Sequence, residues 1–170
     1  HAHRIIHRDI KPSNVLIDAA GGVHVMDFGL ARRLDDGAQI TAAGQVVGTP
    51  QYMSPEQIDG DREGTGPASD VYSIGAVLYE MLTGRPPFTG ATFAEIVAGA
   101  LRNDPVPPRT LDRGIHADLE TICLKCLDKE PHRRYPAGND LARDLERYRN
   151  GEPIEARPAT WATQTMRRVV

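Results

Sequence analysis

Two short apolar runs lie close together near the start of the chain, with a turn between them. Residues 15–17 are Val-Leu-Ile, residues 23–26 are Val-His-Val-Met, and the Ala-Ala-Gly-Gly of residues 19–22 is typical of a turn. This pattern predicts a β-hairpin. Because a hairpin brings its two ends together, Asn14 before the first strand and Asp27 after the second are expected to converge, although thirteen positions separate them.

Apolar residues at helical spacing dominate the remainder of the chain. Residues 70–83 carry apolar side chains, Met81 included, on nearly every face, which predicts a buried helix with Ser69 as its N-cap and Gly84 just past its end. Shorter helices are expected further along the chain, at residues 92–102, 116–127 and 137–150. The pattern therefore indicates a mainly α fold, a helical bundle with one short β-hairpin.

Two stretches lack this periodicity. Residues 30–47 are rich in Gly, Ala and charged residues, which is typical of a long loop. Residues 151–170 lose the helical pattern and have the composition of a linker, with Arg167 and Arg168 near the end. We therefore expect one domain over residues 1–150, followed by a linker or juxtamembrane-like tail over residues 151–170.

Composition narrows the class of protein. A length of 170 residues with 40% hydrophobic residues suits a single domain with a sizeable core. The net charge of −3 predicts no bulk electrostatic attraction to nucleic acid. No segment approaches the roughly 20 apolar residues of a membrane span. The chain starts at His1 without a visible secretory signal, and this start suggests a piece of a longer protein.

The two cysteines, Cys123 and Cys126, form a C-x-x-C pair within an expected helix. A zinc site needs two further ligands at suitable spacing, and the sequence has no second C-x-x-C. We therefore interpret the pair as buried core thiols, which favours a reducing compartment.

The polar residues around the expected hairpin suit phosphoryl transfer, a reaction in which the protein positions a nucleophile and neutralises charge. The carboxylate of Asp9 can take the proton of an attacking hydroxyl, and the ammonium group of Lys11 can sit against a γ-phosphate. The amide oxygen of Asn14 and the carboxylate of Asp27 are the hard oxygen ligands that Mg²⁺ prefers.

These residues occur in the order H-R-D-x-K-x-x-N over residues 7–14, followed by D-F-G over residues 27–29. With both motifs at this separation, the chain resembles the eukaryotic-like (Hanks-type) bacterial serine/threonine protein kinases. The resemblance implies the C-terminal lobe of the α+β protein-kinase fold, with the catalytic and metal-binding loops carried by the hairpin. It also implies ATP and Mg²⁺ as cofactors, with Mn²⁺ as an alternative metal, and Lys11 at its position favours a serine/threonine kinase over a tyrosine kinase.

The resemblance implies further roles around the catalytic loop. His7 is expected to pack against Phe28 as a structural partner and not to act as a general base. Arg8 is expected in a basic pocket that receives a phosphorylated residue of the 30–47 loop, for which Thr41 is the best candidate; an ordinary loop threonine is the alternative. Leu16 matches an apolar position under the adenine ring. An ordinary strand-core leucine is its alternative, and both interpretations predict burial.

The segment GTPQYMSPE, residues 48–56, resembles the substrate-docking loop of these kinases, with Ser54 where the family has alanine. The resemblance places Thr49 as a bridge between the catalytic aspartate and lysine, with a phosphosite as the rival interpretation, and assigns Pro50 and Tyr52 to peptide docking. Two supporting contacts are also implied. Glu56 is expected in a buried ion pair with Arg134, and Asp70 is expected to hold the backbone of the catalytic loop.

The resemblance covers roughly residues 1–150 but only part of a kinase domain, because the chain has no glycine-rich phosphate loop, no V-A-I-K lysine and no glutamate to pair with it. Two functions follow. The first is a serine/threonine protein kinase that phosphorylates protein substrates, present here as a fragment that is inactive by itself. The second is a catalytically incompetent remnant that binds proteins through residues 48–56 and 92–102. A small-molecule phosphotransferase is a weaker third option, since it would not need the docking loop.

Similar bacterial kinases often continue into a membrane span, and Arg167 and Arg168 before two valines suit such a span beyond residue 170. The expected location is therefore cytoplasmic, with an anchor in the inner membrane of the full-length protein. A homodimer that phosphorylates itself in trans is the expected self-association.

Overall fold

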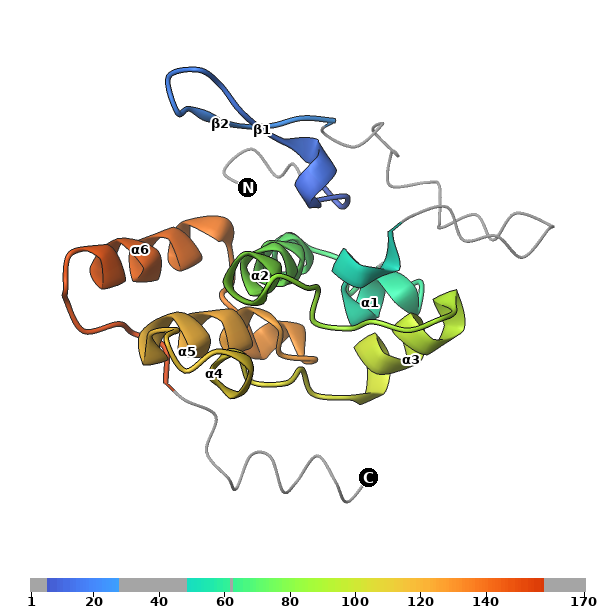
Figure 1. Ribbon diagram of the computed structural model, residues 1–170. Coiled ribbons are helices and arrows are strands. Elements are labelled where there is room, and N and C mark those ends of the chain that lie inside the picture. Colours follow the sequence, from blue (N-terminus) through green and yellow to red (C-terminus); the bar gives the residue numbers. More distant parts are fainter. Residues whose placement is uncertain (1–5, 28–48, 62, 158–170) are drawn as a thin grey trace.

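The computed structural model describes residues 6–27, 49–61 and 63–157 (Figure 1). Its hairpin consists of β1 (Val15–Ile17) and β2 (Val23–Val25), preceded by a 3₁₀ turn, η1 (Pro12–Asn14). The remaining elements are helical: η2 (Pro50–Tyr52), α1 (Pro55–Ile58), α2 (Pro67–Thr83), α3 (Phe93–Arg102), α4 (Pro108–Leu111), α5 (Ala117–Cys126), η3 (Pro131–Arg133) and α6 (Gly138–Arg149). The expected mainly helical fold with one hairpin is therefore present in the described part of the chain.

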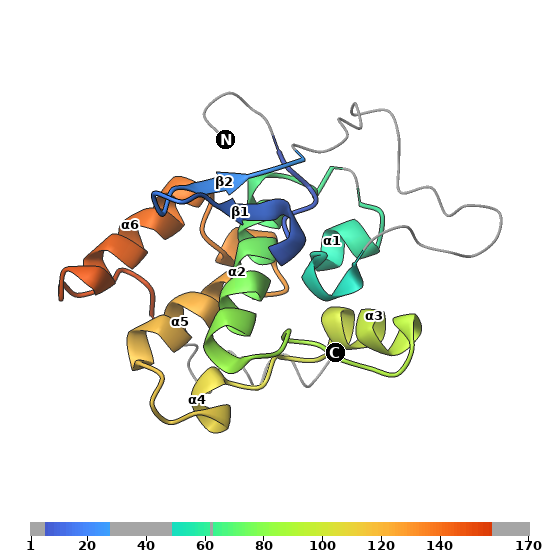
Figure 2. The ribbon, with the colours of Figure 1, turned by 45° about the horizontal axis from the view of Figure 1, so that its top comes forward.

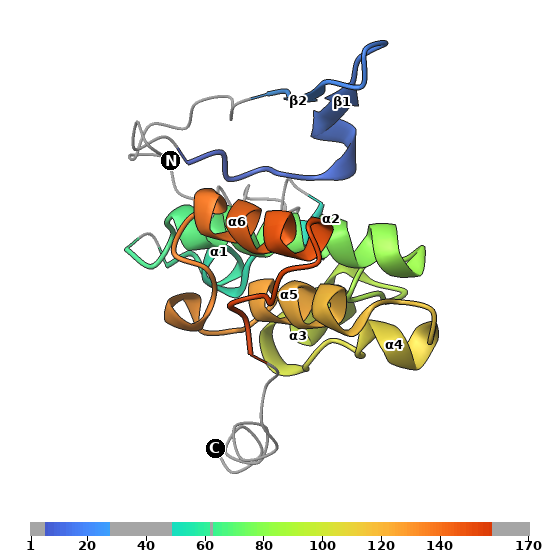
Figure 3. The same ribbon diagram turned by 90° about the vertical axis from the view of Figure 1, so that its left-hand side faces the viewer.

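The helices form two layers, with the hairpin standing above them (Figures 1 and 3). The upper layer holds α6, α2 and α1, and the lower layer holds α5, α4 and α3. Helix α2 runs through the middle of this arrangement and packs against α5 and α6 (Figure 2). Its side chains enter two apolar clusters: Tyr72, Ala76 and Tyr79 lie in the first, and Val71 lies in the second.

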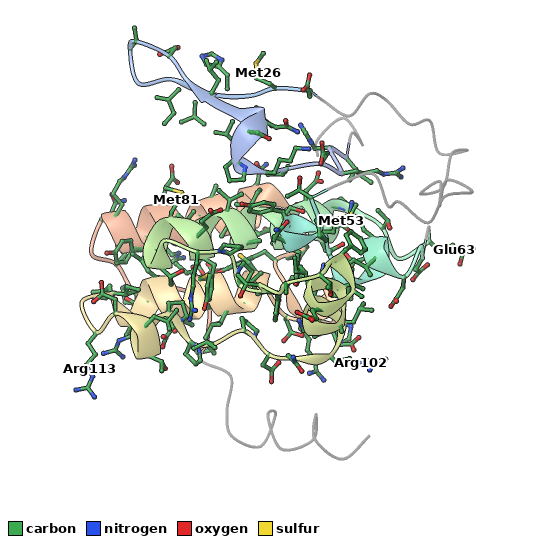
Figure 4. All side chains as sticks on the ribbon, turned by 45° about the vertical axis from the view of Figure 1, so that its right-hand side comes forward. Met26, Met53, Glu63, Met81, Arg102 and Arg113 are labelled. Atoms are coloured by element: carbon green, nitrogen blue, oxygen red, sulfur yellow. The ribbon has the colours of Figure 1, made fainter. Side chains whose placement is uncertain are left out.

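Helix α2 departs from the sequence prediction at two places. It begins at Pro67, with Gly66 as N-cap, because proline fits the first helical position without needing its missing N–H. Ser69 is therefore inside the first turn, where its hydroxyl accepts the N–H of Gly66 at 3.1 Å. Met81, predicted to be buried, is 79% exposed and lies on the hairpin side of the helical body (Figure 4). The predicted end is confirmed, since Gly84 caps the helix in the left-handed conformation.

The two cysteines lie where α5 meets α2, and both are free, buried thiols, as predicted. A Cβ added at Gly75 of α2 would come within 2.4 Å of the Cβ of Cys126, so glycine allows this close approach of the two helices. The thiol of Cys123 donates to the carbonyl of Gly75 at 3.6 Å. Burial raises the pKa of Cys123 to about 12 and that of Cys126 well above its ordinary value, which keeps both protonated.

Residues 151–157 are part of the packed body, in contrast to the linker that their composition predicted from residue 151 onward. Ile154 and Ala156 are buried in the second apolar cluster. The carboxylate of Asp144 accepts the N–H groups of Glu155 at 2.6 Å and Ala156 at 2.9 Å. This segment, called the strap below, runs from the end of α6 across the side of α5 (Figure 3). The domain boundary at residue 150 was therefore placed too early.

The predicted hairpin is confirmed. Its strands are antiparallel and pair Val15 with Val25 and Ile17 with Val23. Asp18 fixes the turn by accepting the N–H groups of Ala20 and Gly22, and Gly21 supplies a positive φ of 83°. Most of the apolar side chains on its strands are exposed in this chain.

Within the described ranges, no helix is long and apolar enough to cross a membrane.

Candidate active site

The loop before the hairpin gathers three of the predicted site residues. The ammonium group of Lys11 lies 2.9 Å from the Oδ2 atom of Asp9. Asn14, buried at the end of η1, donates its amide N–H to the backbone carbonyl of Asp9 at 2.8 Å and to Asp9 Oδ2 at 3.0 Å. These bonds hold the Asp9 carboxylate between a cation and an amide while leaving it half exposed, with a side-chain exposure of 48%.

The hairpin brings the second loop to this place. The N–H of Met26, just past β2, donates to the carbonyl of Asn14 at 2.7 Å, so the backbone next to Asp27 lies beside the end of η1. Asp27 is exposed and has a φ of 51°, a left-handed conformation that is uncommon for a residue other than glycine. The predicted convergence of the two loops is therefore seen at the backbone.

The donor set fits Mg²⁺. Since the amide nitrogen of Asn14 is occupied by Asp9, its oxygen is the group left to bind a cation. The carboxylate of Asp27 has no hydrogen-bond partner among the described residues. One amide oxygen and one carboxylate are hard ligands, and Mg²⁺ commonly takes one or two such protein groups and completes its shell with phosphate oxygens and water.

His7 is buried, and both of its ring nitrogens are engaged by backbone groups. Its Nδ1 atom accepts the N–H of Asp9 at 3.3 Å, which leaves the ring proton on Nε2, where it is donated to the carbonyl of Met26 at 2.9 Å. The ring therefore joins the catalytic loop to the end of β2. This arrangement supports the expected structural role of His7. Its predicted partner Phe28 lies outside the described residues, as does Thr41.

Asp70, in the first turn of α2, holds the backbone of the loop. Its Oδ2 atom accepts the N–H of His7 and its Oδ1 atom accepts the N–H of Arg8, both at 2.8 Å. Burial raises the pKa of Asp70 even though these two hydrogen bonds act in the opposite direction. The carboxylate thus has the position that the sequence analysis expected for it.

Arg8 is held in an unusual conformation directly before Asp9. Its φ of 66° is left-handed, a conformation that costs free energy and recurs at functional sites. The Nε atom of its guanidinium group is buried and has no hydrogen-bond partner within residues 6–27, 49–61 and 63–157. A buried guanidinium nitrogen without a partner fits a site for an anionic group.

The predicted docking segment, of which the structure describes residues 49–56, lies against α2 and α3. Pro50 is buried in η2, and the hydroxyl of Tyr52 donates to the Oε2 atom of Glu80 at 2.5 Å. The hydroxyl of Ser73 donates to the carbonyl of Tyr52 at 2.8 Å. Burial is the main cause that raises the pKa of Tyr52, and the adjacent Glu80 carboxylate adds to it. No hydrogen bond joins Thr49 to Asp9 or Lys11 in the described part of the chain, where Lys11 instead pairs with Asp9 directly.

The expected ion pair between Glu56 and Arg134 is present. Two parallel bonds, of 2.7 and 2.8 Å, join the guanidinium group to the carboxylate, and the hydroxyl of Ser69 donates to Glu56 at 2.6 Å. The other Arg134 N–H groups donate to backbone carbonyls of Ala68, Asp128 and Lys129. Burial alone would raise the pKa of Glu56, but Arg134 and Ser69 together hold it below its ordinary value.

Leu16 is 51% exposed, although both interpretations of this residue predicted burial. The side chain of Leu16 is therefore not enclosed by other elements of the described structure, so it is not part of a strand core there.

Two residues that contact the site were not predicted from the sequence. Glu80 holds Tyr52, and nothing in its helical context distinguishes it from other charged residues. Gln57 reaches the catalytic loop: its amide donates to the carbonyl of Arg8 at 2.8 Å. A signal for Gln57 was available, because the spacing Ser54-x-x-Gln57 is that of a capping box at a helix start.

Comparison with known proteins identifies the same family that the sequence motifs resemble. The protein kinase domain family matches residues 1–144, so the strap lies beyond the matched region. The chain is 48% identical over 157 residues, 92% of its length, to the serine/threonine-protein kinase PknB of Mycobacterium tuberculosis. It is 46% identical over 156 residues to PknB of Mycobacterium leprae, again over 92% of its length. A probable serine/threonine-protein kinase of Streptomyces coelicolor is 41% identical over 165 residues, or 95% of the chain. The chain spans about a quarter of the length of these curated relatives: 25% of each PknB and 24% of the third.

Proposed function

This chain belongs to the protein kinase domain family, among its bacterial serine/threonine members, and we propose that its protein transfers the γ-phosphoryl group of ATP to serine and threonine hydroxyls of other proteins. The observation that carries the proposal is the set of contacts around Asp9. Its carboxylate forms an ion pair with Lys11 and accepts a hydrogen bond from Asn14, and it stays accessible. Hydrogen bonds to Asp70 and His7 fix the loop that carries it.

In this mechanism Asp9 orients the attacking hydroxyl and accepts its proton as the oxygen–phosphorus bond forms. Lys11, 2.9 Å from Asp9, is placed to contact the oxygens of the transferred group, so its positive charge offsets the charge that develops there. Both side chains act by positioning and electrostatics, and the fixed loop means that little reorganisation is needed during the reaction.

Members of the protein kinase family generally use ATP with Mg²⁺. The Asn14 oxygen and the Asp27 carboxylate would hold the cation, or Mn²⁺ in its place, next to the phosphates. When bound, the cation neutralises phosphate charge. Leu16 would contact the adenine ring, which is consistent with an exposed apolar side chain on the same hairpin.

We also propose that residues 1–157 form the C-terminal lobe of the kinase and that the phosphate-covering lobe precedes them in the full-length protein. The absence of a glycine-rich loop and of a V-A-I-K lysine from the 170 residues supports this division. The segment from Thr49 through Pro50 to Tyr52 would dock the substrate peptide. Arg8, with its unpartnered Nε atom, would receive the phosphorylated Thr41.

Three further features of the full-length protein stay predictions. They are a cytoplasmic catalytic region, an inner-membrane anchor beyond residue 170, and a homodimer that phosphorylates itself in trans.

The proposal is tested with the full-length protein and its Asp9→Asn variant, which keeps the size of the side chain but cannot accept a proton. We expect turnover of a serine- or threonine-containing protein substrate to fall by about a hundredfold or more, with ATP binding largely retained. Asp59→Asn is the matched control, since Asp59 is an exposed aspartate at the end of α1 without a contact to the site.

Turnover that survives in Asp9→Asn would contradict the assignment. A wild-type protein that transfers no phosphate but binds a protein through residues 48–56 and 92–102 would favour the binding-module alternative. We expect the 170-residue chain by itself to be inactive, and phosphotransfer by this chain with Mg-ATP would exclude the proposed need for a second lobe.

A further inference from the structure

Gln57 connects the docking segment to the catalytic loop across 49 positions of the chain. Its side chain lies at the start of α1, where its Oε1 atom accepts both the N–H and the hydroxyl of Ser54, each at 3.1 Å. Its Nε2 atom points the other way and donates to the carbonyl of Arg8 at 2.8 Å. One amide therefore bonds to both segments.

The orientation of this amide is determined by its neighbours. With the oxygen toward Ser54, the amide meets two donors, and its NH₂ group meets an acceptor. The reversed orientation would place NH₂ against the N–H of Ser54 and oxygen against the carbonyl oxygen of Arg8, so each end would lose its bond. Ser54 is fully buried, and its hydroxyl adds a second donor that alanine, the usual family residue at this position, would lack.

Hydrogen bonds therefore hold both backbone groups of Arg8, its N–H and its carbonyl. Its N–H donates to Asp70 Oδ1 at 2.8 Å, and its carbonyl accepts from Gln57 at 2.8 Å. This is the residue with a φ of 66°, a conformation that persists only where surrounding contacts enforce it. The Arg8 carbonyl belongs to the peptide unit whose nitrogen is that of Asp9, so Gln57 acts on the orientation of the residue proposed as the proton acceptor.

We propose that Gln57, oriented by Ser54, is a positioning residue for phosphoryl transfer: it fixes the Arg8–Asp9 peptide and couples the placement of the docking segment to the placement of the Asp9 carboxylate. This inference rests on the proposed kinase function. A small displacement of a catalytic group lowers the rate strongly. The effect of Gln57 is therefore expected in kcat, since no hydrogen bond joins its side chain to the proposed ATP-binding residues or to Thr49, Pro50 and Tyr52 within the described residues.

The test uses the full-length protein and the variant Gln57→Glu. This change keeps an oxygen to accept from Ser54 but replaces the NH₂ donor with an oxygen that faces the Arg8 carbonyl oxygen. An acidic residue in the first turn of a helix is also favoured by the helix dipole, so α1 itself is not weakened. Two controls accompany it. Ser54→Ala removes one bond to Gln57 and leaves the bond to Arg8, and Asn139→Asp adds the same charge at an exposed first-turn position of α6.

We expect kcat of Gln57→Glu to fall by about 10- to 100-fold, with the KM for ATP close to that of the wild type and a thermal midpoint that stays above the assay temperature. Ser54→Ala should lose no more than about threefold, because the N–H of Ser54 still orients the amide. Asn139→Asp should be unchanged. A wild-type kcat in Gln57→Glu, or a loss that appears only as a lower thermal midpoint, would overturn the inference and leave Gln57 as a helix cap alone.

Hydrogen exchange at the amides of Arg8 and Asp9 separates this inference from the proposed function. If Gln57 positions the loop, exchange at these two amides should be at least about tenfold faster in Gln57→Glu and unchanged in Asn139→Asp. Unchanged exchange would overturn the positioning role even in a protein that phosphorylates its substrate. Failure of the wild-type protein to transfer phosphate would instead overturn the proposed function, and the exchange measurement would still decide whether Gln57 holds the loop.

Discussion

The hairpin region, residues 6–27, and the helical body, residues 49–157, are stabilised in different ways. The body buries apolar side chains in two clusters and surrounds its buried charges with partners, as at Arg134 and Asp144. The hairpin region exposes apolar strand residues and holds two non-glycine residues, Arg8 and Asp27, at positive φ. Backbone strain at non-glycine residues thus lies, within the described part of the chain, where the proposed chemistry lies, and the packed body provides the stability that tolerates it.

The two regions are joined by directed polar contacts. The Asp70 carboxylate accepts from His7 and Arg8, and the Gln57 amide donates to Arg8. Hydrogen bonds of this kind fix orientation more sharply than apolar contact does, because they weaken steeply with angle and distance. The comparison therefore predicts that substitutions in the body away from these joining contacts act mainly on stability, whereas substitutions in the hairpin region and at the joining contacts act mainly on activity.

The largest loss of stability is expected from the buried ion pair of the body. Glu56→Gln leaves the Arg134 guanidinium, whose side chain has no exposed area, without its charged partner. Removing one member of such a pair costs about 3–5 kcal/mol of unfolding free energy. Urea denaturation of the 170-residue chain measures this loss.

The control is Glu155→Gln, which breaks the exposed pair between Glu155 and Arg147. An exposed ion pair contributes up to about 1 kcal/mol, so this variant should stay close to the wild type. Equal losses in the two variants would contradict the importance of burial at Glu56.

A smaller loss is expected at Asp144, which is 1% exposed and holds the strap. Its carboxylate accepts the hydroxyl of Tyr135 at 2.7 Å as well as the two strap N–H groups. In Asp144→Asn, the NH₂ group faces at least one of these donors, and one unsatisfied buried group costs about 1–3 kcal/mol. Urea denaturation at neutral pH measures the loss, and a variant as stable as the wild type would show that the strap does not depend on this carboxylate.

Asp144 also makes the stability of the folded protein depend on pH. Burial alone would raise the pKa of Asp144, but the bonds from Glu155, Tyr135 and Ala156 hold it below its ordinary value. A carboxyl group with a lowered folded-state pKa contributes stability above its unfolded-state pKa of about 4, and this contribution is lost as the pH falls through the folded-state pKa. The stability difference between wild type and Asp144→Asn should therefore shrink on acidification below about pH 4, whereas a constant difference would contradict a charged Asp144.

Local signals predicted much of this structure. The two short apolar runs with a turn between them, the glycine after α2 and the polar residues at the two strand ends gave the correct elements and the convergence of two loops. The predictions were wrong where contacts between residues far apart in the sequence determine the structure. Ile154 and Ala156 form no periodic pattern, and their burial depends on Asp144 and the second cluster. Ser69 resembles an N-cap, but Pro67 allows an earlier helix start. Residue type alone did not reveal Gln57 as a partner of Arg8, because the bond spans 49 positions.

The smallest effect is expected on the hairpin strands and gives the sharpest test of the comparison. Ile17 and Val23 are directly paired and are 69% and 66% exposed. Threonine keeps the β-branch that favours a strand, so Ile17→Thr with Val23→Thr should change the unfolding free energy of the 170-residue chain by no more than about 0.5 kcal/mol. If a lobe that precedes residue 1 covers this face in the full-length protein, as proposed, the same two substitutions should cost more there, about 1–2 kcal/mol for lost apolar burial. Thermal denaturation of both lengths measures the difference. A large loss in the 170-residue chain would mean that these strands are already packed against it, and the division into a self-sufficient body and an exposed hairpin would be wrong.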